Sequence, residues 1–241
     1  MKNILAKIYI HPFTYLVILI SLLTGLFKEL VTFLYIIIIH ELGHIIAASL
    51  FKWNIKKVKI MPFGGLTIFE DLINKSTFEE IIVLLSGPGL QFINYLIFKD
   101  ITPYFNYYNY GLFIFNMLPI YPMDGYRLLF IVLTRFIPYK KVISISLIIS
   151  LLVLLIFIRF DLIYIIILFL LLVGIINEFK NIKYIYNKFL FERFIYNIHF
   201  KKYKKIKSIN NMYKDKMHLI YDNNRYITEK EALEKYFHKK L

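Results

Sequence analysis

The chain has 241 residues, and 59% of them are hydrophobic, whereas an ordinary soluble domain is nearer half apolar. Its mean hydropathy is +0.59. It contains no cysteine, so disulfides, cysteine nucleophiles and thiolate metal ligands are excluded. Any metal site in this chain must therefore be built from histidine, aspartate or glutamate side chains.

Six apolar runs each approach or reach the ~20 residues with which a helix crosses the hydrocarbon core of a bilayer. These runs are 12–27, 30–51, 78–98, 104–121, 142–158 and 161–177. They predict an all-α, polytopic membrane protein with about six transmembrane helices, of which the fourth is interrupted by several asparagines. The first run follows Lys2 and Lys7, and we interpret it as an uncleaved anchor because a second span follows almost at once and no small-residue cleavage site stands out.

The basic residues are distributed so unevenly that they predict an orientation. If the N-terminus is cytoplasmic, all but three of the 30 lysines and arginines lie on the cytoplasmic side, and the exceptions are Lys28, Lys99 and Arg159. Basic cytoplasmic loops are typical of multi-pass membrane proteins. We therefore expect a multi-pass protein of the cell membrane with both termini in the cytoplasm. This topology accounts for the net charge of +14 and predicts no nucleic-acid partner.

The second run contains the pattern H-E-x-x-H, at His40, Glu41 and His44. Residues four apart share one face of a helix, so both imidazoles can reach one metal ion, and zinc suits such ligands. Glu41 can then act as the general base for a water molecule at the metal. Ionisable residues are rare at membrane depth, which favours a function for all three. The alternatives are interhelical hydrogen bonds or a proton relay.

Two further segments contain residues that interrupt regular structure. The segment 58–72 alternates partly and contains Pro62, Gly64 and Gly65, so it predicts two short strands or a re-entrant loop. Its strand edge could pair with an extended substrate, or it could simply close the cavity. The third run contains Gly87-Pro88-Gly89, which predicts a kink with close helix packing or, alternatively, room for a loop or substrate.

Two histidines leave a zinc site one protein ligand short. Asp124 follows the fourth run, at the depth where the second helix also approaches the cytoplasm, and few other carboxylates lie near membrane depth. Taken alone, Asp124-Gly125 is an ordinary turn. Beside an incomplete zinc site, we interpret Asp124 as the third ligand.

The remaining residues, 181–241, form a basic cytoplasmic tail after a membrane core of residues 1–180. An amphipathic basic helix followed by a linker is expected over 179–208. Residues 217–237 predict a strand, an Asn-Asn turn, a short strand and a helix capped by Thr228. This small appendage is too short for a large core of its own, and its histidines receive no role.

Two motifs together carry a family resemblance. The chain has H-E-x-x-H in one membrane helix and N-x-x-P-x-x-P-x-D-G in another, the second running from Asn116 to Gly125. In this pairing it resembles the site-2 protease family of intramembrane zinc metalloproteases, over about residues 1–180. Within that family, the compact six-span plan is most similar to the stage IV sporulation protease FB group. Members of that group commonly end in a nucleotide-sensing CBS domain, of which 201–241 offers at most a part.

The resemblance implies a set of roles and partners. One zinc ion per chain is bound by His40, His44 and Asp124, Glu41 is the general base, and Asn116, Pro119 and Pro122 position the substrate. The substrate is a membrane-associated protein, and in the sporulation group it is a sigma-factor precursor in the membrane around a developing spore, under the control of regulatory membrane proteins. An anti-sigma factor or remnant signal peptides are alternative substrates.

The same residues are compatible with two other functions. A metal or proton transporter could use these side chains, although few other intramembrane carboxylates exist to form a relay and no internal repeat is evident. An inactive membrane scaffold could bind partners through its basic tail. We favour the intramembrane zinc protease, in which Glu41 assists the attack of water on a peptide bond.

Overall fold

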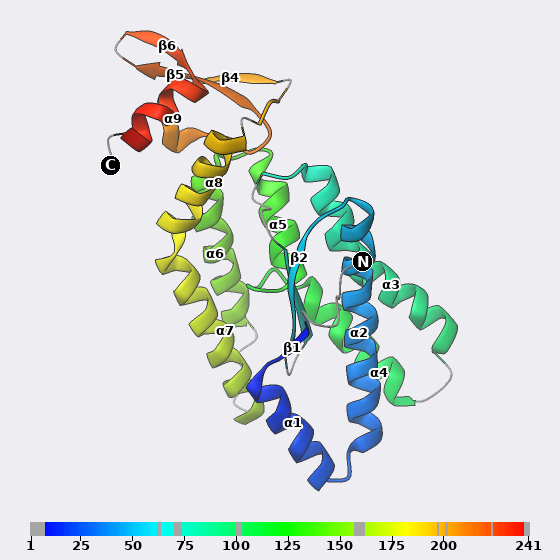
Figure 1. The fold of residues 1–241 in the computed structure, drawn as a ribbon. Coiled ribbons are helices and arrows are strands. Elements are labelled where there is room, and N and C mark those ends of the chain that lie inside the picture. Colours follow the sequence, from blue (N-terminus) through cyan, green and yellow to red (C-terminus); the bar gives the residue numbers. More distant parts are fainter. Residues whose placement is uncertain are drawn as a thin grey trace. The chain divides into compact units, whose positions relative to one another are not determined.

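The structure is a computed structural model, and Figure 1 shows its elements in chain order. It describes residues 8–61, 64–69, 74–99, 103–156, 162–196, 198–200, 202–222 and 224–238. Lys2 and Lys7 before the first run, Pro62 in the turn and Arg159 lie outside these residues. The chain divides into two compact units, Met1–Leu72 with Phe78–Leu118, and Ile73–Thr77 with Pro119–Leu241. The expected division into a core of 1–180 and a tail of 181–241 stays a prediction.

The first unit is built around helix α2 (Phe27–Leu50), which contacts helices and strands of this unit. Its other elements are β1 (Ile8–Ile10), α1 (Pro12–Leu23), β2 (Ile55–Met61), β3 (Gly64–Phe69), α3 (Thr77–Phe98) and α4 (Pro103–Met117). Ile36 and Ile37 of α2 pack against Phe105 and Leu112 of α4. Further along α2, Ile45 packs against the strand pair that follows it. The middle of α2 is therefore buried on several sides.

The expected segment of two strands is confirmed as an antiparallel hairpin of β2 and β3, in which Met61 pairs with Gly64. The sheet has the order β1-β2-β3, and β1 runs parallel to β2. The hairpin lies against α2 (Figure 1) because Ile55 and Val58 place their side chains in the same buried cluster as Ile45. The sheet is thereby fixed beside the helix that carries the histidine motif.

The second unit contains four consecutive helices, followed by a small sheet and a last helix. The helices are α5 (Asp124–Thr134), α6 (Tyr139–Ile156), α7 (Leu162–Lys180) and α8 (Ile182–Tyr196), of which α5, α7 and α8 all contact α6. The expected basic helix is α8. The linker expected after it is wrong in part, because Tyr203–Ile206 forms a strand, β4. In β4 only Ile206 is buried, so its hydrophobic pattern is too weak to mark a strand.

The end of the chain follows its sequence pattern closely. Strands β5 (Met217–Asp222) and β6 (Arg225–Thr228) form an antiparallel hairpin, and helix α9 (Glu229–His238) packs on β5. The N–H of Glu231 donates to the Thr228 hydroxyl at 3.3 Å, which confirms the expected helix cap. A short 3-10 helix, Ile209–Asn211, connects β4 to this hairpin. The small sheet has the order β4-β5-β6.

Among the described residues, three helices are long and apolar enough to cross a membrane: α2, α3 and α6. The number is four if Ile165–Lys180 and Ile182–Tyr196, which meet at an angle of 55°, form one broken span. Helix α1 is apolar but shorter. The protein is thus mostly helical, with three to four candidate spans and two small sheets, and the expected six spans stay a prediction.

Candidate metal centre

Two imidazoles stand on one face of α2, as the spacing of His40 and His44 requires. Both side chains are buried, with 1% and 4% exposure. The Nδ1 atom of His40 lies 2.8 Å from Oε1 of Gln91, and Nδ1 of His44 lies 2.7 Å from the carbonyl oxygen of Val83. Because both partners accept, both Nδ1 atoms carry the proton in the neutral rings. In this tautomer each Nε2 atom carries the lone pair that metal ligation requires.

The orientation of the Gln91 amide is itself fixed by the next residue in this chain of bonds. Its Nε2 donates to the backbone carbonyl of Asn109 at 2.9 Å and to Oδ1 of the same residue at 3.2 Å. Two acceptors at the nitrogen place the oxygen toward His40. Gln91 is fully buried in α3. Its hydrogen bonds join Asn109 of α4 to the ring of His40, so the position of α4 helps to fix that ring.

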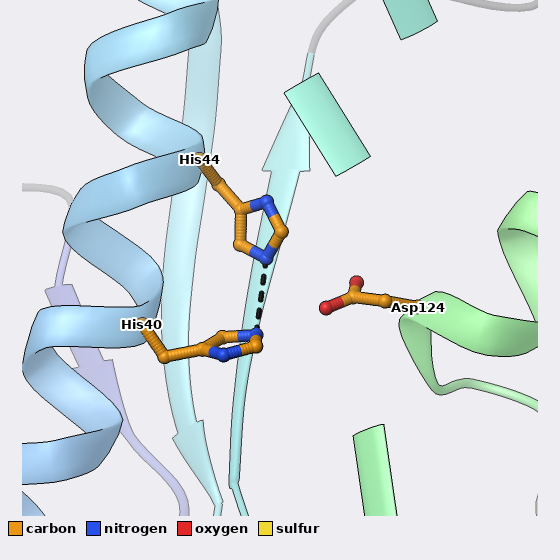
Figure 2. Close-up of side chains that lie close together, drawn as sticks. All are labelled: His40, His44 and Asp124. Carbon is orange, nitrogen blue, oxygen red and sulfur yellow. Dashed lines mark hydrogen bonds between the residues drawn. The ribbon is translucent and has the colours of Figure 1, made fainter. Parts of the chain in front are cut away.

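The two Nε2 atoms lie only 3.2 Å apart, along the dashed line in Figure 2. Two lone pairs at this distance repel each other unless a proton or a cation lies beside them. Two ligands at the 2.0–2.1 Å typical of zinc and imidazole nitrogen are separated by about this distance in a tetrahedral site. The donor atoms therefore fit a zinc ion.

Asp124, the expected third ligand, is the first residue of α5. Within the described part of the chain, His40, His44 and Asp124 form a group that could hold a metal ion, because each offers one ligand atom and these atoms lie within 4.8 Å of one another (Figure 2). Two imidazoles and one carboxylate leave a fourth position for water, as in catalytic zinc sites.

Glu41 is buried next to the first histidine, with 5% exposure, and is held by strand β3. Oε2 of Glu41 accepts a hydrogen bond from the Thr67 hydroxyl at 2.5 Å. Gly65, two residues earlier on the same face of the strand, lies so close that a Cβ atom there would overlap the Glu41 carboxyl group. The hairpin thus fixes the carboxylate from one side.

Glycines also decide how closely α2 and α3 approach. A Cβ atom on Gly43 would overlap the backbone of Ser86 and Gly87, and one on Gly87 would overlap the ring of His44. The expected close helix packing at Gly87 is therefore confirmed. A Cβ atom on Gly89 would have no neighbour within 4 Å. Of these two glycines of α3, only Gly87, which faces the ring of His44, is therefore required by close packing.

The three residues expected to position a substrate lie at and after the end of α4. Asn116 is buried, and its Nδ2 is 3.4 Å from Nε2 of His40, next to the atom that would bind the metal. Pro119 and Pro122 are half-buried in the segment that leads into α5, and the Tyr121–Pro122 peptide bond is cis. Their role toward a substrate stays a prediction.

Comparisons with known proteins relate this chain to a peptidase family. Residues 28–101, which hold the histidine motif, match the model of peptidase family M50. The resemblance to metalloproteases of this family is confirmed.

Two curated relatives and one solved structure support the match. The chain is 37% identical over 149 residues to the stage IV sporulation protein FB of Bacillus subtilis strain 168, covering 58% of this chain and 52% of the relative. It is 27% identical over 118 residues to a zinc metalloprotease of Methanocaldococcus jannaschii, covering 44% and 34%. The chain thus spans about half of the first relative and a third of the second. The solved site-2 protease of M. jannaschii matches with a TM-score of 0.56 at 22% identity, over 71% of this chain and 89% of that one, which shows a shared fold.

Sequence reasoning missed three supporting residues, Gln91, Asn109 and Thr67. Each had a weak signal: Gln91 is a polar residue within an apolar run, Asn109 interrupts the next run, and Thr67 alternates with Gly65 along a strand. None of these signals names the partner, because the contacts join segments that are far apart in the sequence.

Proposed function

We propose that this protein is an intramembrane zinc metalloprotease that cuts membrane-associated protein substrates. The observation that carries this proposal is the pair of Nε2 atoms 3.2 Å apart, beside a buried glutamate, on a helix apolar enough to cross a membrane. Ionisable groups at such depth are energetically costly, so their presence favours a function. The proposal includes six spans with both termini in the cytoplasm, which the distribution of basic residues supports.

In the proposed reaction, His40, His44 and Asp124 hold the zinc. Zinc bound there would supply Lewis acidity, which activates water and polarises a peptide carbonyl. Glu41 accepts the proton of the water and delivers it to the leaving nitrogen of the peptide. The Thr67 hydroxyl donates to Oε2 of Glu41, so it holds that oxygen while Oε1 remains to take the proton. Asn116, Pro119 and Pro122 would align the substrate at the metal.

A transmembrane substrate must unwind before its peptide bond can be cut, because its carbonyls are hydrogen-bonded within the helix. Strand β3 is an outer strand of its sheet, paired in the described residues with β2 alone, and it holds the general base. We propose that an extended substrate segment pairs with this edge. Backbone pairing would bring its carbonyls past Glu41. Phe63, which lies within the segment 58–72 that was expected to pair with a substrate, is outside the described residues.

The substrate class follows from the similarity to the sporulation protein. We propose a membrane-associated sigma-factor precursor as substrate, cut in the membrane around a developing spore and controlled by regulatory membrane proteins. An anti-sigma factor or a remnant signal peptide would use the same site. Co-expression with each candidate separates these alternatives.

The test compares the parent chain with Glu41→Gln, produced with candidate substrates and also purified in detergent for zinc analysis. Loss of the general base should lower cleavage by about 10²–10⁴-fold while zinc binding is retained. The matched control is Glu29→Gln, at the start of the same helix, which should cleave like the parent. Cleavage retained by Glu41→Gln would disprove the mechanism. Ion transport without any cleavage would instead support a transporter.

A further inference from the structure

In the segment in front of Asp124, Tyr121 makes hydrogen bonds to two helices. Its backbone N–H donates to the hydroxyl of Ser150 on α6 at 2.8 Å, and its own hydroxyl donates to Oε2 of Glu178 on α7 at 3.2 Å. Asp124 follows three residues later as the first residue of α5. Met123, the residue before that helix, makes no side-chain cap, so the local sequence alone does not fix where the helix begins.

Packing restricts Tyr121 further. Its ring stands edge-on to the ring of Tyr126, with centroids 5.4 Å apart and planes at 89°. On the other side it approaches Gly174 of α7, where a Cβ atom would lie 3.7 Å from Cδ1 of the tyrosine. Tyr126 accepts a hydrogen bond from Ser146 at 3.2 Å, one helical turn before Ser150 on α6. Aromatic residues on both sides of Asp124 are thus held by one face of α6.

The hydrogen-bond partners of these two tyrosines are polar residues in otherwise apolar helices. Ser146 and Ser150 are both fully buried in α6, a helix composed mostly of isoleucine, leucine and valine. Glu178 is a half-buried acidic residue near the C-terminal end of the apolar helix α7. Polar groups buried in such helices are costly unless they make hydrogen bonds. Their bonds converge on the segment that presents Asp124.

We propose that Tyr121 is a positioning residue for Asp124, acting through Ser150 and Glu178. The inference rests on the proposed function, because it assigns the contacts to the alignment of a zinc ligand. A ligand must be held to within about 0.5 Å of its productive position, and a loop holds it less precisely than a helix unless the loop is itself fixed. Two hydrogen bonds from one loop residue to two different helices supply that restraint.

The test measures zinc affinity by chelator competition on the purified full-length protein. Tyr121→Phe removes only the hydroxyl, and Ser150→Ala removes the acceptor of the Tyr121 N–H. Each should weaken zinc binding by about 10-fold, at the lower end of what loss of an outer-shell partner costs a metal site. Cleavage should recover at saturating zinc. The control is Ser144→Ala, a half-buried serine on another face of α6, which should bind zinc like the parent.

A second pair of variants separates positioning from general stability. Glu178→Gln keeps an oxygen that can accept from the Tyr121 hydroxyl, so it should retain most of the affinity, whereas Glu178→Leu should lose it. Thermal unfolding of the zinc-free protein is measured for every variant. Weakened zinc binding with unchanged unfolding of the zinc-free form supports the inference. A parent chain that binds zinc, with variants that bind it equally well or are weakened only in parallel with unfolding, would overturn this inference alone. A parent chain that binds no zinc would overturn the proposed function and this inference with it.

Discussion

Two buried histidine clusters in this protein have opposite hydrogen-bonding patterns. In the first unit, His40 and His44 direct their Nδ1 protons to acceptors and bring their Nε2 atoms within 3.2 Å of each other. In the second unit, Nδ1 of His218 lies 2.9 Å from Oε2 of Glu229, while its Nε2 accepts the backbone N–H of Tyr213 at 3.0 Å. His40 and His218 are equally buried, at 1% exposure, so burial alone does not distinguish their roles.

The cluster around His218 is satisfied within the protein. Arg193 makes two hydrogen bonds to the carboxylate of Glu229, at 2.6 and 3.0 Å. Its remaining N–H groups donate to the backbone carbonyls of Lys214 and Lys216 at 2.8 and 2.7 Å. Each buried charge faces an opposite charge or a polar backbone group. A buried histidine is structural when donors meet acceptors in this way, and it is a candidate ligand when its Nε2 lies close to that of a second histidine, as at His40 and His44.

The largest effect that would test this difference is expected from Arg193→Ala. Removal of one partner from a buried ion pair leaves Glu229 without its main counter-charge, which costs about 3–5 kcal/mol. Hydrogen exchange of β5 and α9 in the full-length protein should become much faster, because opening free energy sets the exchange rate of protected amides. Zinc binding should stay as in the parent.

The control for Arg193→Ala is Lys235→Ala, which removes the exposed ion pair of Lys235 with Asp222 at 2.6 Å. Exposed pairs contribute at most about 1 kcal/mol, so exchange should change little. If Arg193→Ala exchanged like the parent, the ion pair would not stabilise this region. If the variant lost its zinc, the His218 cluster would not be purely structural.

The candidate ligands were predictable from the sequence, because the two histidines form a local pattern and Asp124 lies in a recognisable motif. The spacing of His40 and His44 places both on one face of a helix, and Asp124 lies in a second distinctive motif. The hairpin after α2 and the strand, turn, strand and helix at the chain end were also predicted, since alternation, glycine and a helix cap act over a few residues.

The residues that hold the candidate ligands in place make contacts between distant segments, and no local pattern encodes these contacts. Gln91 lies 51 residues from His40, and Thr67 lies 26 residues from Glu41. Strand β1 was missed because it has only three residues and pairs with β2, fifty residues away in the sequence. His218 received no role from its sequence, and only the contacts with Glu229 and Tyr213 identify it as structural.

A smaller effect, confined to the first unit, is expected from Gln91→Leu. The substitution removes the acceptor of the His40 Nδ1 proton, so the ring loses the bond that fixes its orientation and its tautomer. Loss of such a partner typically costs 10–100-fold in metal affinity. Chelator competition measures this change, and hydrogen exchange of β5 and α9 should be unaltered.

The matched control is Asn94→Leu on the same helix, since Asn94 donates to the Tyr35 hydroxyl in an exposed position. It should bind zinc like the parent. Unchanged zinc affinity in Gln91→Leu would show that the acceptor at Nδ1 does not prepare His40 for the metal. The hydrogen-bond pattern would then not explain why His40 is a candidate ligand.

The smallest expected effect is a dependence of the His218 cluster on pH. Burial lowers the pKa of His218 below its ordinary 6.5, although the hydrogen bond to Glu229 opposes this shift. Burial would raise the pKa of Glu229, but the hydrogen bonds from His218 and Arg193 outweigh it and the pKa lies below 4.5. Both groups therefore bind protons more weakly in the folded state than in the unfolded state. Stability of this region should be greatest above about pH 6.5, begin to fall below that value as unfolded His218 takes up a proton, and fall again below about pH 4.5.

Hydrogen exchange of β5 and α9 measures this dependence once the intrinsic pH dependence of exchange has been subtracted. The variant His218→Asn should lack the step that begins near pH 6.5 and keep the one at lower pH. Saturating zinc should leave the first step unchanged, because His218 already has a partner at each ring nitrogen and has no lone pair to offer a metal. A step that zinc shifts would instead make His218 a ligand and remove the distinction between the two clusters. The pH series thus tests, in the protein without substitutions, whether the hydrogen-bond pattern distinguishes a structural histidine from a metal ligand.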